Sequence, residues 1–351
     1  MRGKLPSAIM DLDRARDGFM PNLIDETSEA SLWVEQKLSA LPNGDGFGHL
    51  VSAVMWTDGY LENGKPIGGD DPSAIVDEIN EQGQPLLLSH DPGRPVGRVL
   101  AAKAFKSPSG TRFVAAILAY YTHDHQLSFA ALGIDPFPSA DLPAVLPSLD
   151  GVRLALSVDP RDVPKPWTDA LVEDAPLFVK QVQTSYNDAE SLKELIRIAL
   201  PYAAAVWNPL TKTLGEQAGK DVYAGIQHWL KKLWKQLTEL RDPIVEIQAH
   251  HHGCTVSFLF RGHDVDQHYA AHGALSAAAA QAAKLIDTFG AHNPRLTSLT
   301  YEFEQSRWFP SYGILADGRL VSDRSILIAY EQLPKSLSMG LLLQEEDNQQ
   351  Q

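Results

Sequence analysis

Short apolar runs rich in β-branched and aromatic residues alternate with Gly, Pro and Ser between residues 47 and 163. Apolar runs of this kind, bounded by turn residues, are typical of β-strands. The tetrapeptide SPSG (residues 107–110) predicts a hairpin turn between two of them. The predicted strands lie in the segments 49–61, 84–90, 96–105, 111–121 and 152–160.

Helical patterns flank and interrupt this β-rich region. Residues 25–41 begin with the Ser/Thr-then-Glu sequence of a capped helix, and residues 70–82 carry Asp at the cap and Pro in the first turn. Apolar residues recur at helical spacing over 188–207 and 218–240. This spacing predicts two long amphipathic helices.

The last third of the chain predicts the order β–α–β–β. A strand pair over 243–260 surrounds the sequence His-His-His-Gly, and an alanine-rich helix follows over 266–290. We expect this helix to pack closely on a sheet, because alanine lets a helix approach its neighbour. Further strands are predicted over 296–309, 312–321 and 326–333, with Asp317-Gly318 as a tight turn.

These elements predict an α+β fold with a β-rich first domain. The expected parts are a polar and helical N-terminal extension (1–46), a β-rich domain with flanking helices (47–165), a helical connector (166–241), a small C-terminal α+β sheet domain (242–335) and a disordered polar tail (336–351).

Composition narrows the class of protein. A net charge of −14 over 351 residues argues against binding to nucleic acid or to anionic membranes, since the long-range field repels both. The single cysteine, Cys254, excludes an internal disulfide and favours a reducing compartment. The first residues lack the apolar core of a secretory signal, and no apolar run is long enough to span a membrane. We therefore expect a soluble cytoplasmic protein, with assembly into an oligomer left open.

Two polar residues interrupt strands that should remain apolar. His90 ends the run LLLSH, where a histidine is placed to titrate near neutral pH. Ser157 lies late in VRLALSVDP, where alternation predicts another aliphatic side chain. A histidine base beside a serine nucleophile is the arrangement that acyl transfer requires. The alternative is that both residues are strand-end polar groups bonded to backbone.

The same segments resemble a known family. The motifs His90-Asp91-Pro92, Pro95-Val96-Gly97 and Leu156-Ser157-Val158 resemble those of the prohead (capsid-maturation) serine proteases of tailed phages, which are related in fold to the herpesvirus assembly proteases. The resemblance covers about residues 47–163. It implies a closed, protease-like β-barrel flanked by helices, and a serine peptidase with His90 as the base and Ser157 as the nucleophile. Such a peptidase would act on a protein substrate or partner protein in a phage-related or bacterial multi-gene system.

The third catalytic group stays open. Asp91 is the nearest candidate, and other residues are eligible by type: His123, Asp124, His125 and Asp159. Asp159-Pro160 also stand where the family usually has a glycine after the serine. The alternative is therefore a non-catalytic recognition or adaptor protein, with a degenerate protease fold and a sensing module at its C-terminal end.

A second group of candidate residues belongs to the alanine-rich helix. His268 and His272 are four residues apart and share one helix face, which is the spacing used when a helix supplies two zinc ligands. They are the predicted metal ligands, and a pair of solvated histidines is the alternative. Nothing in the chain has phosphate-loop spacing, and we expect no organic cofactor.

Overall fold

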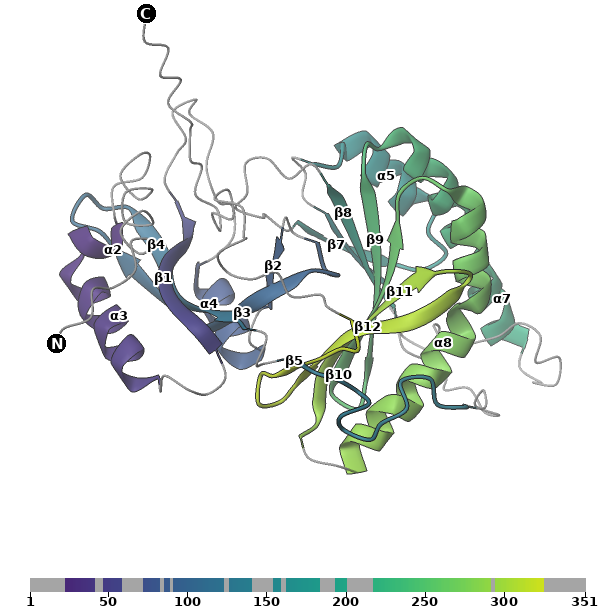
Figure 1. Cartoon of the computed structure of the whole chain (residues 1–351). Coiled ribbons are helices and arrows are strands. Elements are labelled where there is room, and N and C mark those ends of the chain that lie inside the picture. Colours follow the sequence, from purple (N-terminus) through teal and green to yellow (C-terminus); the bar gives the residue numbers. More distant parts are fainter. Residues whose placement is uncertain are drawn as a thin grey trace, which may run out of the picture.

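The structure is a computed structural model that combines two β-sheets with helices, an α+β fold (Figure 1). It describes residues 23–41, 47–58, 72–82, 85–88, 91–122, 126–140, 154–158, 162–183, 193–200, 217–291 and 294–324. The strand predicted over 326–333 and the tail lie outside these ranges.

The first sheet has four antiparallel strands. In spatial order they are β1 (Phe47–Thr57), β4 (Arg112–Tyr121), β3 (Pro95–Lys106) and β2 (Pro85–Leu87). The predicted hairpin at SPSG is confirmed: it joins β3 to β4, and Gly110 supplies the positive φ of +95°. The order is linear, and no pairing among the described strands joins β1 to β2. The closed barrel that the resemblance implies is therefore not confirmed.

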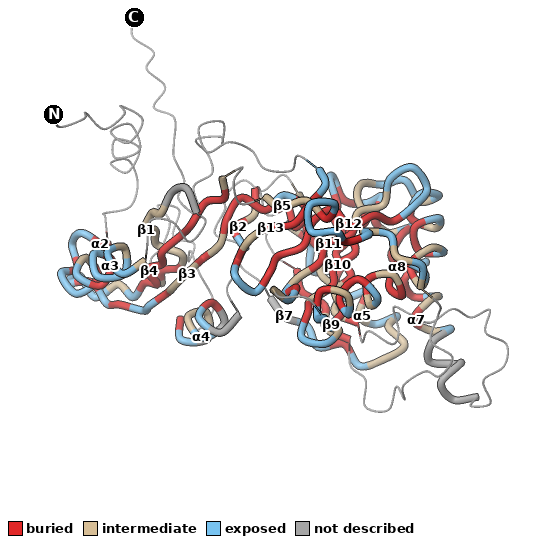
Figure 2. Tube along the Cα trace, turned by 60° about the horizontal axis from the view of Figure 1, so that its bottom comes forward, coloured by how far each residue is buried: buried red, intermediate tan, exposed pale blue. Residues whose placement is uncertain are grey.

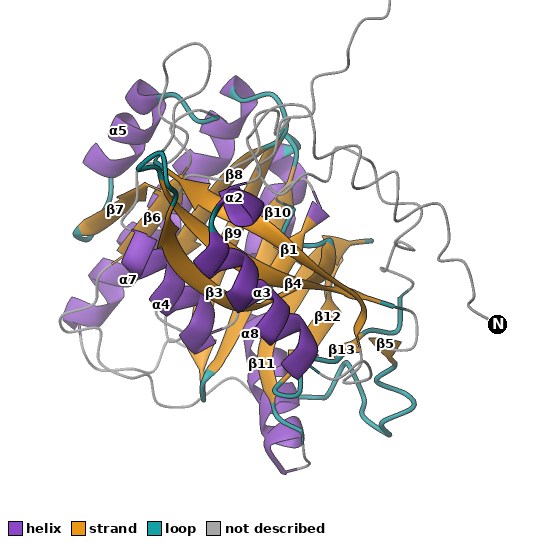
Figure 3. Cartoon of the chain, turned by 90° about the vertical axis from the view of Figure 1, so that its left-hand side faces the viewer, coloured by secondary structure: helices purple, strands orange, loops and turns teal. Residues whose placement is uncertain are grey.

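Helices cover both faces of this sheet, which explains why β4 is apolar throughout. Phe113, Ala115 and Ile117 pack with α2 (Leu23–Glu26) and α3 (Ser28–Ala40). The alternate side chains of β4, from Val114 to Leu118, face the other way toward α4 (Pro72–Gln82). Figure 3 shows α3 and α4 beside these strands. A strand buried on both faces carries a continuous apolar run instead of an alternating one.

The second sheet has nine strands and draws on both halves of the chain. In spatial order they are β5 (Gln126–Leu127), β13 (Leu320–Val321), β12 (Arg307–Leu315), β11 (Leu296–Glu304), β10 (Cys254–Arg261), β9 (Pro243–His251), β8 (Glu194–Ala199), β6 (Leu154–Val158) and β7 (Val179–Gln183). The strand that carries Ser157, β6, thus pairs with β7 and β8 and not with the four-stranded sheet.

The helix predicted over 188–207 is wrong where the structure describes that segment. Residues 194–199 form β8, which lies between β6 and β9. The short run LIRIAL fits both periods, and Ile196 and Ile198 alternate on the buried face of a strand. The segment expected to be a helical connector therefore supplies two strands, β7 and β8, beside the helix α5 (Lys165–Glu173).

Helices cover one face of the nine-stranded sheet. The helix α7 (Gln217–Gln236) and the 3-10 turn that follows it lead into β9, and α8 (Val265–Ala291) links the parallel strands β10 and β11. The predicted alanine-rich helix is confirmed as α8, and Ala279 and Ala282 are fully buried against the sheet. Figure 2 shows these strands buried and the outer side of α8 exposed.

The opposite face of this sheet is polar. Residues paired across neighbouring strands share a face, and one such row contains Ser157, Arg197 and Glu246. Arg197 Nε donates to Glu246 at 2.8 Å, and the Ser257 hydroxyl donates to the other Glu246 oxygen at 2.7 Å. The four-stranded sheet lies on this side. Among the described residues, no helix combines the length and apolar character needed to cross a bilayer.

Candidate binding site between the two sheets

A tight turn between β2 and β3 brings the four-stranded sheet into contact with the other one. Asp91 Oδ1 accepts a hydrogen bond from the Gly93 N–H at 2.9 Å, and the Arg94 N–H donates to the Asp91 carbonyl at 2.9 Å. An aspartate that bonds the backbone two residues ahead stabilises such a turn. We call residues 91–94 the docking turn.

Asp91 anchors the docking turn to the end of β10. Its side chain is 1% exposed, and its two carboxylate oxygens accept hydrogen bonds of 2.9 and 2.7 Å from the guanidinium of Arg261. Lys193, just before β8, lies 3.3 Å from Asp91 Oδ2. Burial by itself raises the pKa of Asp91, but the Arg261 hydrogen bonds and charge, the Gly93 N–H and Lys193 outweigh it and lower the pKa below its usual value.

A tyrosine provides a second, independent anchor. The hydroxyl of Tyr312 in β12 donates to the carbonyl of Pro92 at 2.6 Å. Tyr312 is buried, which raises the pKa of its phenol, so the group remains a neutral donor at physiological pH. Two adjacent residues of the docking turn, Asp91 and Pro92, are thus bonded to the nine-stranded sheet.

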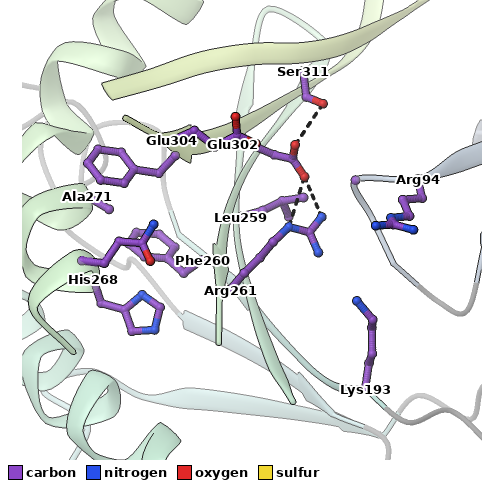
Figure 4. A pocket seen from close by; sticks show the side chains of 13 residues that line it. Arg94, Lys193, Leu259, Phe260, Arg261, His268, Ala271, Glu302, Glu304 and Ser311 are labelled. Carbon is purple, nitrogen blue, oxygen red and sulfur yellow. Dashed lines mark hydrogen bonds and ion pairs between the residues drawn. The ribbon is translucent and has the colours of Figure 1, made fainter. Parts of the chain in front are cut away.

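A cavity of about 580 Å³ opens beside the docking turn (Figure 4). It lies at the carboxyl ends of the parallel strands β10 and β11, next to the N-terminus of α8, which is where α/β sheets commonly bind ligands. Its polar lining includes Arg94, Lys193, Arg261, Glu302 and Ser311, and its apolar lining is Leu259, Phe260, Ala271 and Phe303.

The two carboxylates of the lining are engaged. Glu302 Oε1 accepts from Arg261 at 2.6 Å, and Ser311 donates to Glu302 Oε2 at 3.3 Å. Glu304 forms two hydrogen bonds with Arg324. Arg94, in contrast, has a side chain 61% exposed, and the one ion pair found for it in the described part of the chain is 3.7 Å long, to Asp91. Lys193 has a side chain that is 26% exposed and is paired with both Asp91 and Asp242. Arg94 is therefore the more exposed of the two cations on this side of the cavity.

The structure describes only two of the predicted catalytic residues, Asp91 and Ser157. His90 lies outside the described residues, as do His123, Asp124, His125 and Asp159. Ser157 is buried in β6, paired with Arg197 of β8. Lys193, which contacts Asp91, precedes Arg197 by four residues, about 13 Å along an extended strand. Asp91 and Ser157 therefore lie on the same face of the nine-stranded sheet, but the Asp91 carboxylate bonds Arg261, Gly93 and Lys193.

The predicted zinc ligands lie in the core. His268 Nε2 donates to the Gly262 carbonyl at 2.9 Å, and His272 Nδ1 accepts from the Trp234 indole at 3.3 Å. Burial, with a smaller contribution from Lys231, lowers the pKa of His272 to about 4. These hydrogen bonds occupy one ring nitrogen of each histidine, and the zinc site at His268 and His272 stays a prediction.

Sequence reasoning did not identify the partners of the docking turn. Arg261 ends an apolar strand, and Glu302 alternates with Tyr301 and Phe303. Each pattern indicates a strand with one polar face, but neither indicates that the two strands are neighbours. Comparison with known proteins gives no match: no family model fits the chain, and no curated protein or solved structure is significantly similar to it.

Proposed function

We propose that this chain is a non-catalytic recognition protein that binds a small organic anion in the cavity beside the docking turn. The observation that carries the proposal is that Arg94 and Lys193 line one side of a cavity whose carboxylates are already paired. An anionic group would bind these two cations, and the N-terminal dipole of α8 adds to the positive potential.

The rest of the lining indicates the shape of the ligand. Phe260, Phe303 and Ala271 form an apolar wall, and in Figure 4 Phe260 and Ala271 lie across the Arg261–Glu302 pair from Arg94 and Lys193. A molecule with one carboxylate or phosphate and an apolar body matches both sides. Pockets that bind small molecules commonly combine apolar walls with a few polar groups that fix orientation.

The position of the docking turn supports an adaptor role. Arg94 belongs to the turn before β3, whereas Lys193 precedes β8. A ligand bound to both side chains would strengthen the connection between the two sheets. Ligand binding would thereby change how firmly the two sheets are held together, and a partner protein would respond to that change.

Thermal shift assays with benzoate, hexanoate and phenyl phosphate test this proposal. At least one of these probes should raise the melting temperature of the full chain, and the rise should fall to less than half in Arg94→Gln and in Lys193→Gln. Lys106→Gln is the matched control, because Lys106 is an exposed cation at the far end of β3. Equal shifts in the wild type and the two cavity variants, or no shift with any probe, would reject the proposal.

A serine peptidase of the prohead-protease type is the second candidate. The observation in its favour is that Ser157 lies on the face of the nine-stranded sheet to which the turn after His90 is docked. In this alternative the four-stranded sheet is the counterpart of the protease-like barrel, and Asp91 positions the turn without acting on the substrate. A fluorophosphonate probe should then label the wild type but not Ser157→Ala, and His90→Ala should label at least tenfold more slowly. Absence of labelling in the wild type would remove this candidate.

A further inference from the structure

A separate group of metal-ligating side chains lies at the other end of the nine-stranded sheet. The β9–β10 hairpin turns through His252 and Gly253, whose φ angles are +48° and +77°, and α8 passes beside it. His251, His252 and Asp287 of α8 each offer one ligand atom, and these atoms all lie within 4.8 Å of one another.

We propose that His251, His252 and Asp287 form a binding site for a divalent transition-metal ion of the zinc class. His252 Nδ1 lies 3.2 Å from Asp287 Oδ1, and His251 Nε2 lies 4.0 Å from the same oxygen. Ligands about 2.0 to 2.1 Å from a tetrahedral zinc are separated by about 3.3 Å. The His252–Asp287 separation already fits, and the other distances need to close by about 1.5 Å or less.

The backbone contacts of the hairpin and the exposure of two of the side chains allow these ligand distances to shorten. Arg295 donates to the His252 carbonyl at 2.8 Å, which holds the hairpin turn in place. The side chains of His252 and Asp287 are 69% and 53% exposed, so both can rotate onto an ion without disturbing the core. The imidazole rings of His251 and His252 stack with their centroids 4.1 Å apart, so the two rings are already close enough to share one ion after a small rotation.

The ligand types select the ion. Two imidazoles with one carboxylate suit zinc, nickel and copper better than magnesium or calcium, which prefer oxygen ligands. Three protein ligands leave a further coordination position open. His252 and Asp287 also line a second cavity of about 250 Å³, together with Gly290, Leu296 and Arg295, from which water or a small anion can complete the coordination.

Metal titration of the full chain, with any affinity tag removed and after treatment with a chelator, tests the site. Calorimetry with Zn²⁺ and the visible absorption of bound Co²⁺ should each give one equivalent of metal. His252→Asn and Asp287→Asn should each weaken Zn²⁺ binding by at least about tenfold. Asparagine is chosen for His252 because it tolerates a positive φ.

His250→Asn is the matched control, because His250 is exposed in the same strand but points to the opposite face. It should leave the affinity unchanged. Binding of less than about 0.1 equivalent by the wild type would overturn the proposal. So would stoichiometric binding retained at full affinity in both His252→Asn and Asp287→Asn, which would assign the metal to other histidines such as His268 and His272.

Discussion

Replacing Asp91 with asparagine is expected to lower the free energy of unfolding by about 3 kcal/mol, measured by urea denaturation at pH 7. Asparagine keeps the shape of the side chain and can still accept the Gly93 N–H. It removes the negative charge that faces Arg261 and Lys193 in a site where the carboxylate is 1% exposed. Loss of one partner from a buried ion pair leaves the other charge poorly compensated, and Glu302 offsets only part of this cost for Arg261.

The effect should depend on pH in a defined direction. Because the folded protein lowers the pKa of Asp91, the ionised carboxylate contributes stability that is complete above the unfolded value of about 3.9 and is lost as the pH falls through the folded pKa. The difference between wild type and Asp91→Asn should be constant from about pH 5 to 8 and shrink below about pH 4.

Asp317→Asn is the matched control for Asp91. Asp317 is paired with Arg319 at 2.7 Å, but both side chains are about 40% exposed, and exposed pairs contribute roughly 0 to 1 kcal/mol. A loss of less than about 1 kcal/mol in Asp91→Asn, or a loss equal to that in Asp317→Asn, would show that the docking turn does not depend on this ion pair.

Adding a single methyl group at Gly93 is expected to displace the docking turn and to cost about 2 to 3 kcal/mol. A Cβ at this position would overlap the Arg261 guanidinium and the Glu302 carboxylate and would also touch Leu259. The first two groups are held by hydrogen bonds to Asp91 and Ser311, so they cannot move aside without breaking those bonds. Gly93→Ala should therefore lower the urea concentration at the midpoint of unfolding. It should also speed the exchange of backbone amide hydrogens near Arg261, on the polar face of the nine-stranded sheet.

Gly273→Ala is the control for the effect of the methyl group itself. Gly273 is exposed in α8, and a Cβ there has open space around it. Alanine in a helix interior is more favourable than glycine, so this variant should gain up to about 1 kcal/mol. A neutral Gly93→Ala variant would mean that the turn and β10 are less tightly packed than the structure indicates.

Local sequence patterns predicted correctly those elements whose apolar spacing fits either a helix or a strand but not both. The β3–β4 hairpin carries a turn signal at Gly110, and the alanine-rich helix has 27 residues of consistent spacing. Residues 194–199 failed because six apolar-rich residues satisfy a helix and a strand equally well, and the neighbours β6 and β9 decided the outcome. The spacing of apolar residues within a segment does not indicate which distant strands that segment pairs with.

The candidate site was predictable only in part for the same reason. The unusual His90-Asp91-Pro92 sequence drew attention to the docking turn, and the structure gives Asp91 a carboxylate that binds a guanidinium 170 residues further along the chain. An aspartate that follows an apolar strand indicates a polar function, but its type alone does not separate a catalytic group from an anchor. In the structure the partner of this aspartate is Arg261, and the catalytic role of Asp91 stays a prediction.

The pairing of β5 with β13 has a consequence for synthesis of the chain on the ribosome. Residues 126–127 bond with residues 320–321, and β6 at 154–158 waits for β8 and then β9. The four-stranded sheet is complete by residue 121, but the nine-stranded sheet cannot close its β5 edge until nearly 200 further residues have emerged. Distant pairings slow folding. The apolar segment around Leu156 has a shorter wait, because its antiparallel partner β8 begins about 40 residues after β6 begins, and until then it is exposed to non-native contacts.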